Sequence, residues 1–127
     1  MLWRALLAAA CLLAGTANAA ETAVIGQEAL LKRLDAKDAS LIVLDVRTPE
    51  EFAQGHVPGA VNIPYTHLPA RIAELPSAAD KDVVVYCTVG VRAERAAARL
   101  KENGFKRLLH LDGDMNKWLE KGRPTQK

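Results

Sequence analysis

The sequence predicts a single small α/β domain, with a mostly parallel central sheet flanked by helices on both faces. Two patterns support this prediction. Short, wholly apolar runs recur along the chain, as strands buried on both faces of a sheet require. Segments with apolar residues at helical spacing alternate with these runs, which is typical of parallel sheets built from strand–helix–strand units. The sequence contains no internal repeat and no low-complexity linker, so one core is expected.

The first nineteen residues show the three-part pattern of a secretory signal peptide. Arg4 is the basic residue, an apolar run covers 5–14, and 17–19 reads Ala-Asn-Ala, an A-x-A cleavage pattern before Ala20. This run is about ten residues long and a spanning helix needs about 20, so a cleaved signal is favoured over an uncleaved anchor. A lipid anchor at Cys11 is disfavoured, because cleavage before it would leave almost no apolar region.

Cleavage would shorten the 127-residue chain by nineteen residues and send it to the periplasm. The expected organisation is a signal peptide at 1–19, a short lead at 20–25, one domain at 26–121 and a C-terminal tail at 122–127. A chain of this size with one domain is expected to be a monomer, with no stable membrane association after cleavage.

Charge and cysteine content narrow the function. The chain has 17 basic and 15 acidic side chains, and Arg4 is the one basic residue in the signal segment, so the mature net charge is +1. This balance argues against a nucleic-acid binder. Cys11 would leave with the signal, so Cys87 is the one mature cysteine. An odd cysteine in an oxidising compartment suggests a reactive thiol or an intermolecular link.

The elements of the N-terminal half follow from apolar spacing and helix-start signals. Thr48, Pro49 and Glu51 mark a helix start, since threonine suits the N-cap, proline the first position and glutamate the third. Three leucines at 30, 31 and 34 share one face of an earlier helix. The predicted elements are a helix at 26–36, a strand at 41–44, a helix from Thr48, a turn at 56–59, a short strand at 60–63 and a helix at 66–74 ended by Pro76.

The C-terminal half has clearer periodicity. Three alanines at 93, 96 and 97 and Leu100 share one helix face, and Gly104 suits the position after that helix. Trp118 is expected to point inward from the last helix. The predicted elements are a strand at 83–86, a helix at 92–103, a strand at 108–111 and a helix at 114–121.

Cys87 follows the most strongly predicted strand and precedes a helix. Ligands of open α/β sheets bind beyond the carboxyl ends of the strands. Backbone N–H groups and the start of the helix favour an anion there, so a thiol at this place is expected to be a nucleophilic thiolate near neutral pH. Gly90 permits a positive φ, and Arg92 is expected to neutralise an anionic substrate or to pair with a carboxylate. The alternative is that Cys87 is a small buried core residue.

The ordered motifs of the chain resemble the rhodanese family of sulfurtransferases. The matching segments read LDVRTPEEF at 44–52, GHVPGAVNIP at 55–64, VYCTVGVRA at 85–93 and LDG at 111–113, followed by Trp118. The resemblance covers roughly 26–121 and implies a rhodanese domain in which Cys87 carries a sulfane sulfur as a persulfide. It implies thiosulfate as a donor and cyanide or a thiol as the acceptor, with no metal and no organic cofactor. The implied substrate-binding residues are Thr88, Val89, Gly90, Val91, Arg92 and Arg47.

The length of the loop also separates this chain from related activities. From Cys87 to Arg92 the loop is C-x4-R, whereas related phosphatases and arsenate reductases of this fold use C-x5-R for a larger oxyanion. Ala93, the sixth residue after Cys87, supplies no arginine and replaces the serine of many relatives. Asp114 replaces a glycine of many relatives, and we expect it to cap the last helix.

Several other polar residues have structural or functional interpretations. Asp45 is expected to support the active loop by pairing with Arg92 or Arg47, or else to bond its own turn. Arg47 either reaches the pocket mouth to attract an anionic donor or is a solvated surface residue. His56 is expected to bond within its turn. The histidines at 67 and 110 have no neighbours at metal-ligand spacing, so both read as ordinary surface or core residues.

Two other functions remain open at this point. A rhodanese fold could act as a sulfur carrier or docking module that exchanges sulfur with a partner protein and turns over little small-molecule substrate, which the uncharged loop side chains favour. A thiol redox role in the envelope is weaker, because the mature chain lacks a resolving cysteine and would need mixed disulfides with another protein.

Overall fold

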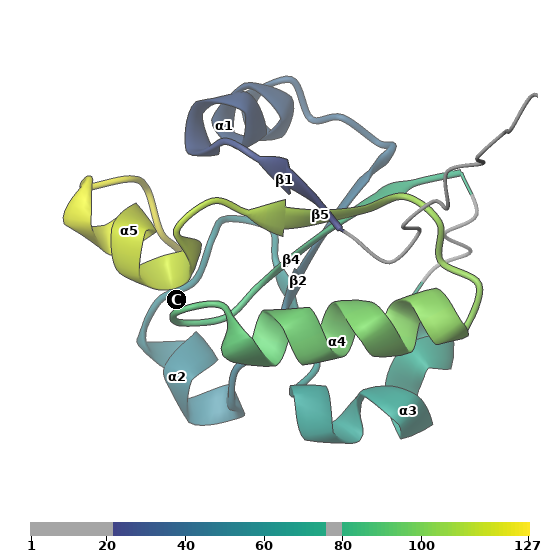
Figure 1. Cartoon of the computed structure of the whole chain (residues 1–127). Coiled ribbons are helices and arrows are strands. Elements are labelled where there is room, and N and C mark those ends of the chain that lie inside the picture. The colour runs from purple at the N-terminus through teal and green to yellow at the C-terminus, as the bar shows by residue number, and fades with distance from the viewer. Residues whose placement is uncertain (1–21, 76–79) are drawn as a thin grey trace, which may run out of the picture.

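A computed structural model of the chain describes residues 22–75 and 80–127. The predicted signal peptide, Cys11 and Pro76 lie outside these residues. Over the described ranges the chain forms a five-stranded sheet in the order β1-β5-β4-β2-β3, with every strand pair parallel (Figure 1). The α/β prediction is confirmed. The strands are β1 (Ala23–Ile25), β2 (Leu41–Asp45), β3 (Val61–Asn62), β4 (Asp82–Tyr86) and β5 (Leu108–Leu111).

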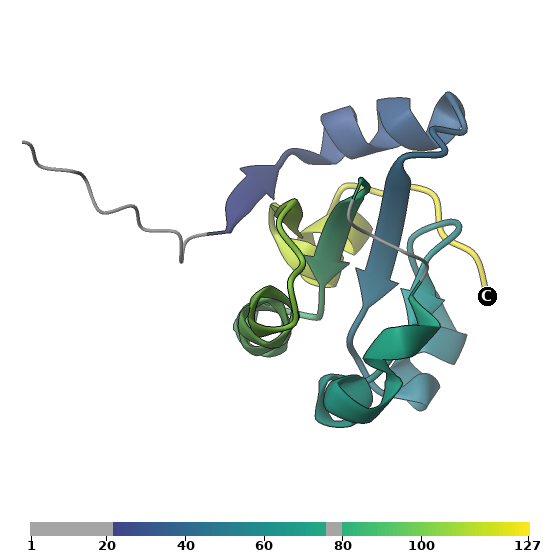
Figure 2. The same cartoon turned by 90° about the vertical axis from the view of Figure 1, so that its right-hand side faces the viewer.

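Helices cover both faces of the sheet, as Figures 1 and 2 show. On one face α1 and α5 pack over a core that includes Leu30, Met115 and Trp118. On the other face α3 and α4 pack over Leu68 and Leu100. The helices are α1 (Gln27–Asp35), α2 (Pro49–Gln54), α3 (Leu68–Arg71), α4 (Val91–Glu102) and α5 (Asp114–Glu120).

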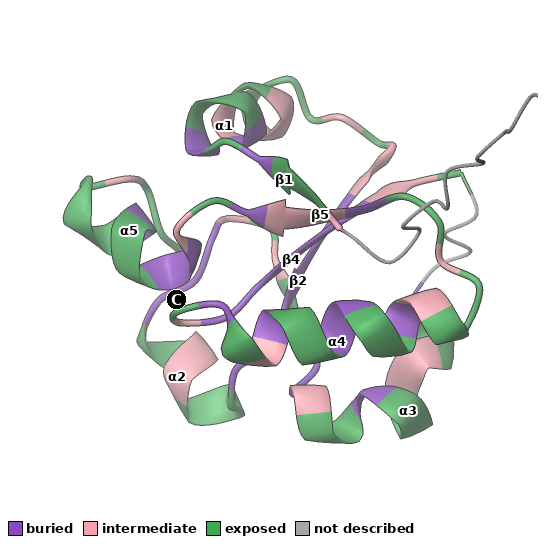
Figure 3. Ribbon diagram, viewed as in Figure 1, coloured by how far each residue is buried: buried purple, intermediate pink, exposed green. Residues whose placement is uncertain are grey.

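The two central strands alternate between these two cores. In β4, Val84 and Tyr86 belong to the α1/α5 side, whereas Val83 and Val85 belong to the α4 side. Figure 3 shows β2 and β4 buried along most of their length, while the outer faces of the helices are exposed. Burial on both faces explains the continuous apolar runs of the sequence, because neither face of these strands meets water.

Most predicted elements agree with the structure to within one or two residues. Thr48 is the N-cap of α2, its hydroxyl accepts the Glu51 N–H at 3.2 Å, and Glu51 accepts the Thr48 N–H at 3.0 Å. This confirms the predicted capping box. Gly104 follows α4 with φ +90, and Trp118 is fully buried, as expected.

One helix prediction is wrong. The segment 66–74 is not one helix but three short turns: a 3-10 turn at Tyr65–His67, α3, and a second 3-10 turn at Ile72–Glu74. Pro69 explains the break, since proline has no N–H for an interior helix bond and fits only the first turn of α3.

The edge strand β1 was not predicted. Its three residues lie in the segment read as a lead, and they gain their partners only by pairing with Leu109–Leu111 of β5. The tail after α5 also contacts the domain: Gln126 and His56 exchange backbone hydrogen bonds of 2.9 Å in both directions. Among the described residues, no helix has the length and apolar character to cross a membrane.

Candidate active site

Cys87 is the first residue after β4 and continues its alternation. It lies two positions after Val85, so its side chain falls on the α4 side of the sheet, where it is 1% exposed. Its Sγ accepts the Gly90 N–H at 3.0 Å and the Ala93 N–H at 3.4 Å. The thiol sulfur therefore lies inside a loop whose backbone donors converge on it, an arrangement that stabilises negative charge on sulfur.

Gly90 turns the chain from the loop into α4. It is the N-cap of α4 with φ +116, a backbone conformation that favours glycine because it has no Cβ. This turn aims the Gly90 N–H back at Cys87 Sγ. Gly90 thus adopts the positive φ that a glycine at this position permits.

The start of α5 holds the loop from its other side. The Met115 N–H donates to the Cys87 carbonyl at 2.9 Å, and the Asn116 N–H donates to the Thr88 carbonyl at 3.1 Å. These bonds use N–H groups of the first turn of α5 that have no partner within the helix. Cys87 and Thr88 are thus held between the first turns of two helices.

Arg92 pairs with a carboxylate, one of the two roles expected for it. Its Nη1 donates to Glu51 Oε1 at 2.7 Å and its Nη2 to Glu51 Oε2 at 3.1 Å. The Thr88 hydroxyl donates to Glu51 Oε2 at 3.1 Å and accepts from Arg92 Nη2 at 3.0 Å. The hydrogen bonds from Arg92 lower the pKa of Glu51 to about 2. Glu51 thus ties α2 to the loop, whereas its sequence position predicted only a capping role.

Asp45 and Arg47 form a buried ion pair beside the site. Arg47 Nε and Nη2 donate to the Asp45 carboxylate, with the shortest distance 2.6 Å, and Asp45 also accepts the Arg47 N–H at 2.9 Å. Arg47 Nη2 donates further to the Gly55 carbonyl at 2.9 Å. Arg47 is therefore not a solvated surface residue. Its attraction for an anionic donor stays a prediction, and its Nε and Nη2 groups already donate within the protein.

Asp114 differs from its expected role. The N-cap of α5 is Gly113, and Asp114 makes no side-chain cap bond, so the capping prediction is wrong. Its Oδ1 instead accepts the Cys87 N–H at 3.0 Å, and both of its carboxylate oxygens lie within 3.0 Å of His110 Nε2. His110, interpreted from the sequence as an ordinary surface or core residue, thus contacts the carboxylate that accepts the Cys87 N–H.

The surface around the loop is apolar at its tip and polar at one side. Val89 and Val91 are 66% and 54% exposed. A hollow of about 290 Å³ lies beside the loop and is lined by Glu51, Thr88, Asn116 and Leu119, among others. Three basic side chains around the loop, Arg47, Arg92 and His110, each have a carboxylate partner.

The other two histidines lie away from the cysteine. His56 Nδ1 lies 3.0 Å from the Phe52 carbonyl, and its ring stacks on Phe52 with centroids 3.6 Å apart. It therefore bonds at the end of α2, close to the predicted turn. His67 is exposed and its Nδ1 lies 3.3 Å from the Thr66 hydroxyl, so it reads as a surface residue.

Similarity to known proteins places the chain in a family. The rhodanese-like domain family matches residues 26–121, and the chain belongs to this family. A protein of Allochromatium vinosum named sulfurtransferase is 40% identical over 100 residues, which are 79% of this chain and 91% of that relative.

Two further similarities agree with this assignment. A Bacillus subtilis (strain 168) protein, whose name describes it as a candidate sulfur carrier, is 36% identical over 82% of this chain, which spans 55% of that relative. A crystal structure of a rhodanese-related protein from Thermoplasma volcanium superposes with a TM-score of 0.70 at 28% identity, covering 82% of this chain and 97% of that one.

Proposed function

We propose that this protein is an exported sulfurtransferase in which Cys87 carries a sulfane sulfur as a persulfide. The observation that carries the proposal is the pair of backbone N–H groups, from Gly90 and Ala93, that point at Cys87 Sγ. A nucleophilic thiolate and a persulfide anion both benefit from such fixed donors, which need no reorganisation when charge develops. The relative named sulfurtransferase supports the same activity.

The proposed cycle has two displacements and no net oxidation. The Cys87 thiolate attacks the outer sulfur of thiosulfate, a new S–S bond forms, and the old S–S bond breaks with its electron pair leaving on sulfite. Cyanide or a thiolate then attacks the outer sulfur of the Cys87 persulfide. The S–S bond breaks, the electron pair returns to Cys87 as thiolate, and thiocyanate or a new persulfide departs. The chain's own residues supply the nucleophile and the donors, without a metal or an organic cofactor.

The charge around the site bears on the choice of donor. Arg92 is neutralised by Glu51, and Arg47 by Asp45. A thiosulfate dianion therefore meets few uncompensated cations, and we expect a weak apparent affinity for it. This observation favours the second candidate function, in which the domain exchanges sulfur with a protein thiol. The relative named as a candidate sulfur carrier supports that alternative.

The destination of the protein is part of the proposal. The signal-peptide pattern at 1–19 sends the domain to the periplasm, where Cys87 would be the one thiol of the mature chain. Edman sequencing of the protein purified from the periplasmic fraction tests this step, with Ala20 expected as the first residue. A full-length chain retained in the cytosol would contradict it.

One experiment separates the two functions. Mature protein is incubated with thiosulfate, and its intact mass is compared with that of Cys87→Ser. A gain of about 32 Da, one sulfur atom, is expected on the wild type and not on the variant. Thiocyanate formation with cyanide is then measured for both proteins. Loading with turnover supports the enzyme, and loading with little turnover supports the carrier. Equal thiocyanate rates for wild type and variant, or no adduct with any sulfane donor, would contradict persulfide chemistry at Cys87.

A further inference from the structure

Asp114 occupies a backbone position that favours glycine. Its φ is +52, in the left-handed region, directly after Gly113 with φ +78. A residue with a Cβ is disfavoured in this region, although aspartate tolerates it better than most. An uncommon backbone conformation that persists at a site suggests that the side chain is needed there. Asp114 is 3% exposed, so its carboxylate is placed inside the protein and not in water.

The Asp114 carboxylate is bonded on two sides. Oδ1 accepts the backbone N–H of Cys87 at 3.0 Å, and His110 Nε2 lies 2.9 Å from Oδ1 and 3.0 Å from Oδ2. A buried carboxylate is costly unless it is hydrogen-bonded and neutralised. The Cys87 N–H satisfies part of this requirement, and the imidazole of His110 supplies the charge when it is protonated.

The same pair lies against the turn of the loop. A β-carbon added to Gly90 would lie 3.1 Å from Asp114 Oδ2 and 3.3 Å from His110 Cε1. Gly90 donates its N–H to Cys87 Sγ. The Asp114–His110 pair therefore lies against the loop at two points, the Cys87 N–H and the Gly90 turn, and these are the residue that carries the sulfur and a residue that donates to it.

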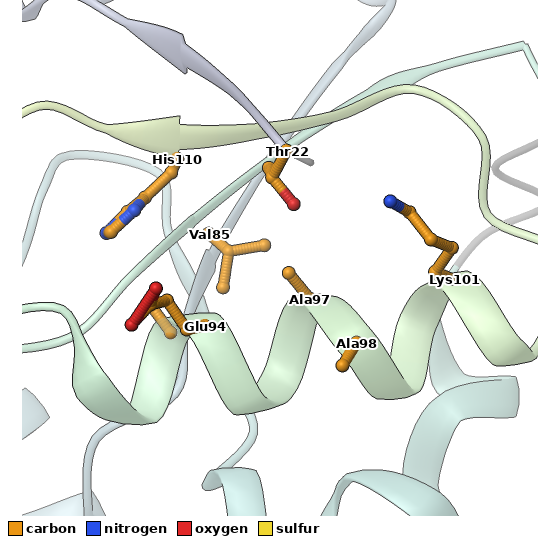
Figure 4. Close-up of a pocket in the computed structure, with 8 residues that line it drawn as sticks. Thr22, Val85, Glu94, Ala97, Ala98, Lys101 and His110 are labelled. Atoms are coloured by element: carbon orange, nitrogen blue, oxygen red, sulfur yellow. The ribbon is translucent and has the colours of Figure 1, made fainter. Parts of the chain in front are cut away.

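The other charged groups around His110 come from the turn after β5 and from two helices. Asp112 lies in that turn and Asp114 is the first residue of α5. Glu94 and Lys101 come from α4 and line the same hollow as His110. Figure 4 shows the His110 ring and the Glu94 carboxylate at one end of this hollow and the Lys101 side chain at the other. The hydrogen bond to Asp114 is the largest cause that raises the pKa of His110, with smaller contributions from Glu94 and Asp112.

We propose that Asp114 and His110 are positioning residues for sulfur transfer, in which Asp114 holds the start of the Cys87 loop and protonated His110 cancels the charge of that carboxylate. This inference rests on the proposed persulfide function. When His110 is protonated the pair is neutral and the anion on Cys87 is tolerated. When His110 loses its proton, the uncompensated Asp114 carboxylate repels the thiolate and the persulfide anion. Sulfur loading should therefore slow as pH rises through the raised pKa of His110.

The test is the rate at which thiosulfate loads one sulfur on Cys87, followed by intact mass from about pH 5.5 to about pH 9. Two variants of the mature protein separate charge from structure. His110→Gln keeps a donor to Asp114 without a titratable charge, and Asp114→Asn keeps an acceptor for the Cys87 N–H without the carboxylate. His67→Gln, at an exposed histidine away from the loop, is the matched control.

We expect the two variants to change the pH dependence of sulfur loading in opposite ways. At the acidic end His110→Gln should load about five- to tenfold more slowly than wild type, and at the basic end the two should converge. Asp114→Asn should match wild type at the acidic end and exceed it by a similar factor at the basic end. His67→Gln should follow wild type throughout.

Other outcomes overturn the inference. A basic decline that survives unchanged in both His110→Gln and Asp114→Asn would exclude the pair as its cause. An equal slowing of both variants at every pH would reduce the pair to a structural role. Failure of wild type to load sulfur at any pH would instead contradict the proposed function itself. Thermal unfolding of each variant, followed by circular dichroism, shows whether a slow variant is also an unfolded one.

Discussion

The Glu51 carboxylate and the Arg92 guanidinium form a two-point ion pair that joins the start of α2 to the start of α4, with the Oε1–Nη1 distance at 2.7 Å. The pair closes one side of the Cys87 loop through the Thr88 hydroxyl. Glu51 also neutralises the positive charge of Arg92, which then attracts an anionic sulfur donor less strongly. The contact therefore orders the loop but weakens the attraction of the site for an anionic donor.

Replacing Glu51 with glutamine tests this opposition. Glutamine keeps the capping interaction with Thr48 but removes the negative charge that neutralises Arg92. Because 35% of the Glu51 side chain and 27% of the Arg92 side chain are exposed, solvent screens the pair, and we expect a loss of only about 0.5–1 kcal/mol in the free energy of unfolding. The KM for thiosulfate should fall by about two- to fivefold, since Arg92 becomes available to an anion.

Urea unfolding and steady-state kinetics measure these two effects. Glu50→Gln, an exposed neighbour in the same turn of α2, is the matched control and should change neither quantity. An unchanged or higher KM in Glu51→Gln would show that Arg92 does not attract the donor.

The same ion pair predicts a pH dependence of stability. Arg92 holds the pKa of Glu51 at about 2, below its usual 4.5. A carboxylate with a lowered folded-state pKa stabilises the fold above its unfolded pKa, and this contribution is lost as pH falls through the folded value. The stability difference between wild type and Glu51→Gln should therefore be present above pH 4.5 and should be largely lost as pH falls to about 2. A difference that stays undiminished down to about pH 2 would assign the stability to uncharged contacts.

The sequence predicted the parts of this molecule that depend on local pattern. The apolar runs of β2 and β4, the alanine face of α4 and the capping box at Thr48 each lie within a few residues of chain, where spacing fixes geometry. The position of Cys87 at the carboxyl end of β4 was also predictable, because a residue between a buried strand and a helix lies at that edge of the sheet.

Contacts between distant segments could not be predicted in the same way. Glu51 and Arg92 lie 41 positions apart, and Asp114 and Cys87 lie 27 apart. Asp114 and His110 are only four apart, but the spacing spans the end of a strand and a turn, where no helical rule places residues together. The edge strand β1 is three residues long, too short to show a period.

Tyr86 supports the turn at Val57 by a buried hydrogen bond. Its hydroxyl accepts the Val57 N–H at 3.0 Å, the ring is fully buried, and burial raises the pKa of its phenol. Tyr86→Phe leaves that N–H without an acceptor, so we expect a loss of about 1–3 kcal/mol in the free energy of unfolding. Tyr65→Phe, at a half-buried tyrosine on the other face of the sheet, is the control and should change stability by less than about 0.5 kcal/mol. Equal effects of the two substitutions in urea unfolding would contradict a special role for the Tyr86 hydroxyl.

Gly90→Ala tests the loop at the glycine whose N–H faces the sulfur. Two costs are expected: a Cβ at φ +116 is strained, and it would meet Asp114 Oδ2 at 3.1 Å. Gly104→Ala separates these costs, because Gly104 has φ +90 but no atom within 4 Å of the added Cβ. Both variants should lose about 1–2 kcal/mol of stability from the left-handed backbone alone.

Sulfur loading distinguishes the two glycine variants. Gly90→Ala should load Cys87 about ten- to a hundredfold more slowly, because displacing the Gly90 N–H removes a fixed donor to the anion. Gly104→Ala should load at the wild-type rate, since its strain lies at the far end of α4. Intact-mass kinetics on both variants, with unfolding curves to match their stabilities, provide the comparison. A Gly90→Ala protein that loads sulfur at the wild-type rate would show that the Gly90 N–H does not stabilise the reacting sulfur, and the loop would then act only as a scaffold for Cys87.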